Sequence, residues 1–411
     1  MVIWNNGPQN PGVYASWKVN SSDSDGINTI PDIKLIVCKT AEPGPIVNGA
    51  CDGGPSDTWC TSALTPGGPS IPTSCGFTLP IPTVDGTFNA YMYIVDQFNL
   101  PATDASQGYN SIYTVYNVAP VVSSVTLNGG SAITLTESTT TTVSMTASVT
   151  DNNGCRNLGN TADEISSVKG YLYRSGITYT GCDTVGEANN NNCYPELTCS
   201  AGTCTNGVTT YTCSANVQYY ADPTDMNYCS FTIPWYRQHW LATINAIDNN
   251  SFSGNATLGT GVELNSLVGF TTQSLIDYGE LSAGGVNDPL DKTTVITPTG
   301  NAPFNVNISG TKLCTDYSTC STSGKTPLDI AQQKYSLITG TSYASGTALS
   351  ATPTKALIGV PKVNNGTVTT KTIWWGVSIP IGTVSGIYNG VNTITATSEG
   401  VPYQGGTCEP C

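Results

Sequence analysis

Residues 77–89 read FTLPIPTVDGTFN, and residues 377–389 read VSIPIGTVSGIYN. The two copies share Pro80, Ile81, Thr83, Val84, Gly86 and Asn89, which return as Pro380, Ile381, Thr383, Val384, Gly386 and Asn389. Residues 229–234, CSFTIP, open a third and weaker copy. In each copy apolar and polar residues alternate, stop at Pro and Gly, and resume, which predicts strand, turn and strand. We therefore interpret the chain as one β-domain design used about three times.

The composition is typical of extracellular β-proteins. The length of 411 residues favours about three domains of roughly 100–150 residues each. Only 10% of the residues are charged, against roughly 25% in an average soluble protein. The net charge of −14 and the pI of about 4.3 argue against the basic stripe of a nucleic-acid-binding protein. We expect no nucleic-acid partner, and the charge is compatible with bound cations.

Fifteen cysteines without a metal-finger spacing indicate an oxidising compartment. Reduced core cysteines are the alternative. The chain shows no signal peptide and no apolar run of about 20 residues. We therefore expect an extracellular protein at the cell surface, with no membrane span in this chain, present here in a mature or truncated form. Met1 need not be the native start.

Alternating stretches divide the chain into three domains and a tail. Residues 1–118 have predicted strands at 14–19, 33–39, 90–95 and 111–116, with a Cys-rich insertion at 38–75. Residues 119–262 have predicted strands at 122–127, 133–136, 142–149, 168–175 and 241–247, with a Cys/Asn-rich loop at 182–213. Residues 263–404 have predicted strands at 269–272, 293–297, 304–309, 369–374 and 391–397, with a short helix at 327–335. Residues 405–411 form a Cys-containing tail.

Many short strands with almost no helix predict antiparallel sandwiches. Residues 119–127 (APVVSSVTL), 136–143 (TESTTTTV) and 149–154 (VTDNNG) resemble the tandem immunoglobulin-like domains of surface proteins of bacteria and archaea, of surface-layer, filament or adhesin type. Residues 269–285 and 297–309 resemble a further module of those proteins. The resemblance implies an all-β fold of three tandem immunoglobulin-like antiparallel β-sandwich domains with disulfide-rich loops. It carries no catalytic residues.

The start of the first domain departs from this pattern. About 22 residues precede its Asp turn, against about 30 in the second domain, so its first edge strand is short or missing. Residues 2–4 either close the sheet within their own chain or leave an incomplete edge. An incomplete edge would accept a strand from another subunit.

We expect no catalytic site and no enzyme activity. His239 is the single histidine, and Ser-His-Asp, Cys-His or zinc sites need further partners that converge on it. Most of the acids lie in turns, where Asp belongs for backbone reasons. A carbohydrate-active enzyme that uses two carboxylates across a cleft is the alternative.

Asp residues at turns and strand ends are candidate ligands for a structural calcium ion, the one cofactor we consider. Near domain joins, carboxylates from two domains would clamp the ion and stiffen a rod. Ordinary Asx-turns are the alternative. The candidates are Asp23, Asp25, Asp96, Asp151 and Asp248.

All fifteen cysteines are disulfide candidates. The first domain holds Cys38, Cys51, Cys60 and Cys75, for which we consider Cys51–Cys60 nested inside Cys38–Cys75. The second holds an odd number, which leaves one thiol over or a bond that reaches outside: Cys155, Cys182, Cys193, Cys199, Cys204, Cys213 and Cys229. Cys314 and Cys320 close a small loop. Cys408 and Cys411 form a local bridge or a crosslink to a neighbour.

Five sequons mark candidate glycosylation sites in exposed turns, at Asn20, Asn249, Asn255, Asn307 and Asn365. The adjacent Trp374 and Trp375 lie on a predicted strand and should point to opposite faces. We expect one of them in the core rather than both in a sugar platform.

These features together favour a secreted, disulfide-stabilised structural protein. We expect a self-assembling subunit of a cell-surface filament or surface layer, assembled with copies of itself through sheet edges and domain joins. An adhesin that binds a glycan or protein ligand is the alternative, with the 182–213 segment as its candidate site. The same sandwiches serve either function.

Overall fold

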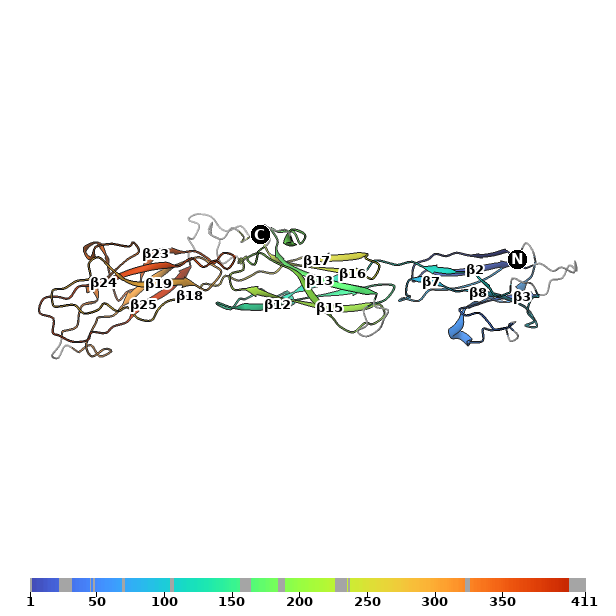
Figure 1. Ribbon diagram of the computed structural model, residues 1–411, viewed down its shortest axis with the longest axis horizontal. Helices are drawn as coiled ribbons and strands as arrows, with labels where there is room; N and C mark the ends of the chain where they lie inside the picture. The colour runs from blue at the N-terminus through green and yellow to red at the C-terminus, as the bar shows by residue number, and fades with distance from the viewer. Residues whose placement is uncertain are drawn as a thin grey trace.

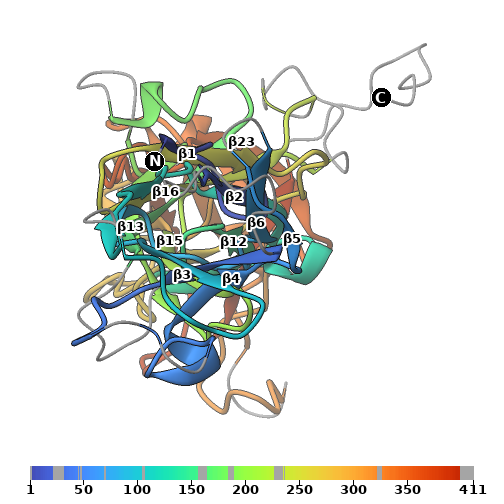
Figure 2. The same cartoon turned by 90° about the vertical axis from the view of Figure 1, so that its right-hand side faces the viewer.

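The structure, a computed structural model, describes residues 2–21, 32–44, 46, 49–68, 71–103, 107–155, 164–183, 189–225, 235, 237–321 and 326–398. Its strands form three β-sandwiches laid end to end as a rod (Figure 1). A view along the rod shows the three sandwiches overlapping (Figure 2). In this part of the chain no helix is long and apolar enough to cross a membrane.

The first sandwich contains the strands from β1 to β10. One sheet has the order β1-β2-β6, the other has the order β4-β3-β8-β9, and β10 pairs with β7. The strands are β1 (Val2–Asn5), β2 (Tyr14–Asn20), β3 (Asp32–Cys38), β4 (Thr58–Thr61), β5 (Thr65–Pro66), β6 (Pro72–Thr78), β7 (Gly86–Phe88), β8 (Tyr91–Asp96), β9 (Tyr109–Asn110) and β10 (Tyr113–Val115). Because β1 pairs with β2 of the same chain, residues 2–4 close their own sheet.

The second sandwich contains the strands from β11 to β17. The strands are β11 (Val121–Leu127), β12 (Thr140–Thr150), β13 (Ile165–Arg174), β14 (Cys193–Ala201), β15 (Val208–Gln218), β16 (Trp240–Asp248) and β17 (Ser253–Thr257). Strand β14 begins beside β13 and ends beside β15, so it belongs to both sheets. The orders β11-β12-β15-β14 and β13-β16-β17 match the two sheets of an immunoglobulin domain.

The third sandwich contains the strands from β18 to β25. One sheet has the order β18-β19-β24-β21-β22 and the other β23-β20-β25. The strands are β18 (Phe270–Thr271), β19 (Lys292–Pro298), β20 (Phe304–Gly310), β21 (Gln333–Ser336), β22 (Thr347–Ala348), β23 (Thr354–Val360), β24 (Lys371–Val377) and β25 (Asn392–Ser398). Short 3-10 turns lie at η1 (Gly54–Asp57), η2 (Asn128–Gly130), η3 (Gly181–Asp183), η5 (Ile330–Gln332) and η6 (Tyr343–Ser345).

Each sandwich has its own apolar core, built from the side chains that alternate onto the inward face of each strand. The three cores contain one fully buried tryptophan each, namely Trp17, Trp240 and Trp375. Trp375 points into the core while its neighbour Trp374 is only half-buried, as the strand alternation predicts. The predicted all-β fold of immunoglobulin-like sandwiches with several disulfides is confirmed.

Three local predictions are wrong. The Cys/Asn-rich loop predicted at 182–213 contains β14 and much of β15, which are framework strands. The helix predicted at 327–335 is the single turn η5 followed by β21, because Gln333 and Tyr335 turn inward and pair with β24. Only Ile133 of the predicted strand 133–136 makes a bridge, to Leu264.

Candidate functional site

The repeated motif of the first sandwich lies against the second sandwich, and this contact is called the first joint. The Thr83 amide donates to Asn152 O over 3.1 Å. The Asn153 side chain donates to Thr83 O at 3.1 Å and to Tyr116 O at 3.0 Å, and it accepts from the Val118 amide at 2.7 Å. The buried Asn153 therefore links the motif loop and the connecting segment to the second sandwich by hydrogen bonds.

Four carboxylates gather at the first joint, and we call them the joint carboxylates. Asp85 belongs to the motif loop of the first sandwich. Asp151 follows β12, Glu164 precedes β13, and Asp248 ends β16, so the alternation of antiparallel strands brings these three to one end of the second sandwich. Asp151, Glu164 and Asp248 are each 1% exposed.

Backbone and amide groups satisfy only part of this cluster. Asp248 Oδ1 accepts from the Asn250 and Phe252 amides at 2.9 and 2.8 Å, and Asp248 Oδ2 accepts from Asn117 Nδ2 at 2.9 Å. Asp151 Oδ1 accepts from the Asn153 amide at 2.8 Å. Side-chain amides reach the other two, from Asn249 Nδ2 to Glu164 Oε2 at 3.0 Å and from Asn250 Nδ2 to Asp85 Oδ2 at 2.7 Å.

Three buried oxygens at the first joint have no hydrogen-bond partner: Asp151 Oδ2, Glu164 Oε1 and Asn117 Oδ1. Burial raises the pKa of Asp151 to about 6, with the negative charges of Asp248 and Asp85 adding to the shift and the Asn153 amide opposing it. Burial and the negative charges of Asp85 and Asp151 together raise the pKa of Glu164 to about 7, and the hydrogen bond from Asn249 opposes the shift. The cluster thus concentrates more negative charge than its donors balance.

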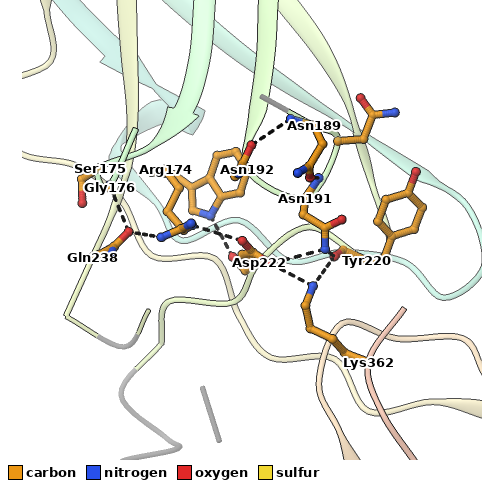
Figure 3. Close-up of polar contacts among 12 residues, drawn as sticks. Arg174, Ser175, Gly176, Asn189, Asn191, Asn192, Tyr220, Asp222, Gln238 and Lys362 are labelled. Atoms are coloured by element: carbon orange, nitrogen blue, oxygen red, sulfur yellow. Dashed lines mark hydrogen bonds and ion pairs between the residues drawn. The ribbon is translucent and has the colours of Figure 1, made fainter. Parts of the chain in front are cut away.

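The second joint, between the second and third sandwiches, is a network of ion pairs (Figure 3). Asp222 Oδ2 lies 3.1 Å from Arg174 Nε, and Asp222 Oδ1 lies 2.8 Å from Lys362 Nζ. Arg174 ends β13 of the second sandwich, whereas Lys362 lies between β23 and β24 of the third. The ammonium group of Lys362 also donates to Tyr220 O at 3.2 Å. One carboxylate thus joins cations from two sandwiches.

Aromatic and amide groups surround this network. Both cations lie near the Trp235 ring, Arg174 Cζ at 4.9 Å and Lys362 Nζ at 5.2 Å from its centroid. Asn191 donates to Val363 O at 3.4 Å and accepts from the Asn365 amide, so it also bridges the two sandwiches. Burial lowers the pKa of Arg174 and of Lys362, and the charge of Asp222 opposes both shifts. Removing one partner from such a buried network leaves an uncompensated charge.

The Asp residues that the sequence indicates as calcium ligands do not all lie together in the structure. Asp151 and Asp248 meet at the first joint. Asp96 lies at the opposite end of the first sandwich, because β8 starts beside the motif loop and runs away from it. There Asp96 Oδ1 accepts from the Phe98 and Leu100 amides at 2.8 Å each, which is an Asx-turn like that of Asp248. Asp23 and Asp25 lie outside the described residues.

Sequence reasoning missed three members of the first joint, namely Asp85, Glu164 and Asn117. A signal for Asp85 was present, because it is the one acidic residue of the repeated motif and its copy has Ser385. Glu164 and Asn117 flank predicted strands and carry no local pattern. Another cluster, Glu42 beside Cys38 and Cys51, is no metal site because the two sulfurs form a disulfide.

The described part of the chain contains six disulfides. They are Cys38–Cys51, Cys60–Cys75, Cys155–Cys204, Cys182–Cys193, Cys199–Cys213 and Cys314–Cys320. In the first sandwich, each disulfide joins two cysteines that follow one another in the sequence. The predicted nested arrangement of Cys51–Cys60 within Cys38–Cys75 is therefore wrong. Cys229, Cys408 and Cys411 lie outside the described residues. Six disulfides are compatible with an extracellular or cell-surface location.

The remaining candidates lie apart from the joints or serve other contacts. His239 Nδ1 lies 2.9 Å from Glu263 Oε1, and both side chains are partly exposed. Among the sequons, Asn249, Asn255 and Asn365 are exposed, whereas Asn20 and Asn307 are half-buried. Asn20, Asn255 and Asn307 lie in strands rather than in turns, so the prediction of exposed turns is wrong for these three.

Comparisons with known proteins identify no family. No family model matches the chain, and no curated protein matches it. Among solved structures, a marsupial T cell receptor aligns at 9% identity over 97% of this chain and 98% of its own, with a TM-score of 0.22. A membrane-anchored protein of Corynebacterium diphtheriae aligns at 11% identity over 96% and 86%, with a TM-score of 0.19. The chicken CNTN1 FN1-FN3 domains align at 7% identity over 96% and 97%, with a TM-score of 0.17. These scores are too low to carry an argument about function.

Proposed function

We propose that this protein is an extracellular structural subunit that assembles with copies of itself into a cell-surface filament or surface layer. A structural subunit must hold its two ends in a fixed orientation relative to each other. Both joints of this rod are buried polar contacts rather than loose linkers, which suits that role better than independent domains on flexible tethers. The role is structural rather than catalytic.

The single observation that carries the proposal is the second copy of the motif. In the first sandwich, residues 80–85 sit on the second sandwich, where the Thr83 amide donates to Asn152 O. In the third sandwich, residues 380–385 lie at the free end of the rod, because β24 ends there at Val377 and β25 returns from it at Asn392. Here the amide of Thr383 donates back to Pro380 O at 3.2 Å. The same joining loop therefore recurs without a described neighbouring sandwich.

The free end also presents apolar side chains. Ile381 is 93% exposed and Ile387 is 80% exposed, and Val384 and Val391 are each more than a third exposed. Clustered apolar residues of this kind mark interaction surfaces. The occupant that fits is the first sandwich of another copy, because the second sandwich, built on the same plan, receives the first copy of the loop. Such a head-to-tail contact is heterologous, and it generates a filament when it does not close into a ring.

The edge of the third sandwich offers a second contact surface. In the described part of the chain, β25 pairs with β20 alone, whereas the corresponding strand β16 of the second sandwich also pairs with β17. An edge strand with unpaired backbone groups is a template for pairing with another chain. Lateral pairing of rods through β25 would convert filaments into bundles or sheets.

The proposal is tested by sedimentation velocity of the full chain across a concentration series in calcium-containing buffer. We expect the wild type to form species larger than the monomer, and the double variant Ile381→Asp/Ile387→Asp to sediment as a monomer. Leu357→Asp is the matched control, because Leu357 is 72% exposed on β23, at the side of the same sandwich. Unchanged circular dichroism of the variants would show that folding is intact.

Two outcomes would overturn the proposal. One is a wild type that remains monomeric at every concentration. The other is a double variant that assembles as well as the wild type. A monomeric wild type would favour the adhesin, and glycan and protein arrays would then be the next experiment.

A further inference from the structure

The turn of the second sandwich that contacts the first motif loop has a counterpart at the outer end of the first sandwich. Asp248 of β16 pairs with Ile165 of β13, and Asp96 of β8 pairs with Ile33 of β3. Because each pair joins the last residue of one strand to the beginning of the other, the two aspartates occupy equivalent positions. The first sandwich lies at one end of the rod (Figure 1), and β8 runs away from the first joint. Asp96 therefore lies at the free end.

The two turns have the same backbone hydrogen bonds. Asp248 Oδ1 accepts from the amides two and four residues ahead at 2.9 and 2.8 Å, and Asp96 Oδ1 accepts from the corresponding amides at 2.8 Å each. The amide of each aspartate also donates to the carbonyl four residues ahead, at 2.9 Å in the second sandwich and 3.0 Å in the first. The third residue after the aspartate has a positive φ in both turns, 70° at Ser251 and 61° at Asn99. We call residues 248–252 the inner turn and residues 96–100 the outer turn.

The inner end of the second sandwich contacts the motif loop at two places that its side chains determine. Asn250 of the inner turn donates from Nδ2 to Asp85 Oδ2 over 2.7 Å. Gly207 lies beside Pro82, because a Cβ placed on Gly207 would be 3.8 Å from Pro82 Cβ. The first joint thus matches an amide with a carboxylate, and a residue without a side chain with a proline.

The outer end of the first sandwich has apolar side chains at the same two places. Phe98 occupies in the outer turn the position of Asn250 in the inner turn. Ile71 directly precedes β6 as Gly207 precedes β15, and the first residue of each strand pairs with the last residue of β2 or β12. Phe98 is 71% exposed, Leu100 is 63% exposed and Ile71 is 48% exposed. We call these three residues the outer patch.

The second copy of the motif loop differs from the first in the complementary sense. Three pairs of corresponding residues differ: Pro82 and Gly382, Asp85 and Ser385, and Thr87 and Ile387. The second copy has lost its carboxylate and gained an exposed isoleucine, which suits an aromatic neighbour such as Phe98. It has a glycine in place of the proline, which leaves room for Ile71. Both matches of the first joint have therefore changed on both sides.

We propose that the outer patch binds residues 380–387 of another copy, in the way that the inner turn binds residues 80–85 of its own chain. This contact extends the proposed self-assembly, on which it rests, by naming the surface that receives the free loop. Its apolar side chains leave water on association, whereas the corresponding pair within the chain, Asp85 and Asn250, is polar. The difference keeps the two kinds of contact distinct, because an apolar patch would leave the Asp85 carboxylate without its partner.

The test uses two variants of the full chain that block opposite ends of the rod. Phe98→Asp/Leu100→Asp places charges in the outer patch, and Ile381→Asp/Ile387→Asp places them on the free loop. In sedimentation velocity, at concentrations where the wild type assembles, each variant alone should self-associate about tenfold more weakly or less. An equimolar mixture should form a dimer of one copy of each, because one intact loop and one intact patch remain to meet. Tyr109→Asp is the matched control and should assemble like the wild type, because the exposed Tyr109 pairs with the start of β8, at the other end of the first sandwich.

The outcomes separate this contact from the proposed function. If the wild type assembles and Phe98→Asp/Leu100→Asp assembles equally well, self-assembly stands and the outer patch is not the receiving surface. A mixture of the two variants that stays monomeric overturns the contact in the same way. A wild type that is monomeric at every concentration overturns the proposed function and this contact with it. Circular dichroism of each variant checks that it is folded.

Discussion

Lys362 Nζ and Asp222 Oδ1 lie 2.8 Å apart across the boundary between the second and third sandwiches. The two residues are far apart in the sequence, and each side chain is largely buried. Because Asp222 also pairs with Arg174, a single carboxylate holds cations from both sandwiches. The relative orientation of the last two sandwiches therefore depends on the ion pairs that the buried Asp222 carboxylate makes with Arg174 and Lys362.

Removing a cation from this network should weaken the second joint. Lys362→Met keeps most of the side-chain volume but leaves Asp222 with Arg174 alone, and breaking a buried pair costs about 3–5 kcal/mol. We expect denaturant unfolding to begin earlier and the third sandwich to move independently, as measured by small-angle X-ray scattering. Lys292→Met is the control, because Lys292 pairs with the exposed Asp291 and such pairs contribute about 0–1 kcal/mol. Equal effects of the two substitutions would contradict this account of the joint.

The first joint should be sensitive to Asn153. Its side chain makes three hydrogen bonds, to Thr83, Tyr116 and Val118, which lie on the other side of the joint. Asn153→Ala leaves these three partly buried backbone groups without the Asn153 side chain, at about 1–3 kcal/mol for each group that water does not reach. We expect a broader distribution of rod lengths in scattering data and a lower melting temperature. Asn364→Ala, at an exposed position in a turn of the third sandwich, should change neither.

The disulfides should differ in their contribution to stability according to the loop that each closes. Cys155–Cys204 spans 49 residues and Cys314–Cys320 spans 6. The chain-entropy relation gives about 4 kcal/mol for the first and about 2 kcal/mol for the second. Replacing each pair with Ser and measuring guanidinium unfolding should show the larger loss for the Cys155/Cys204 variant. The opposite order would mean that local packing rather than loop closure sets these contributions.

The hydroxyl of Tyr113 should make the first sandwich sensitive to alkali. Tyr113 is fully buried against Trp17 without a hydrogen-bond partner for its hydroxyl, and burial raises its pKa from 10.0 to about 12. The folded state holds this proton more tightly than the unfolded state. The contribution of the protonated Tyr113 to the free energy of unfolding is therefore fully present below pH 10 and is lost as the pH rises towards 12.

Tyr113→Phe removes both the unsatisfied hydroxyl and this titration. We expect it to gain about 1 kcal/mol at neutral pH and to shift alkaline unfolding, followed by circular dichroism, to higher pH. Tyr14→Phe, at an exposed position on β2 of the same sandwich, should change neither. An alkaline midpoint that stays in place in Tyr113→Phe would show that Tyr113 does not control this transition.

Local patterns predicted most of the framework strands. The alternation around Trp17 and around Val143 places both ends of β2 and β12 to within two residues, because a half-buried strand needs an apolar residue at every second position. The same reasoning failed at residues 182–213. Polar residues there occupy the outward face of β14 and β15, and the inward face includes Cys199 and Cys213, so the density of Cys and Asn indicates a loop where the chain forms two strands.

The joints were only partly predictable. Asp151 and Asp248 were found because each follows a long alternating stretch. The partners that make the site, Asp85 and Glu164, lie far apart in the sequence and meet only when two sandwiches are in place. Lys362 was missed for the same reason, since nothing in its neighbourhood indicates that Asp222 lies beside it. Contacts between domains depend on the whole arrangement, which local periodicity does not encode.

Electron microscopy of the purified full chain in calcium, beside the Ile381→Asp/Ile387→Asp variant, would decide whether the rods join end to end. We expect end-to-end strings of rods with a repeat of one chain length for the wild type, and single straight rods for the variant. Single rods of the wild type at every concentration, or strings that the variant forms equally well, would contradict this expectation.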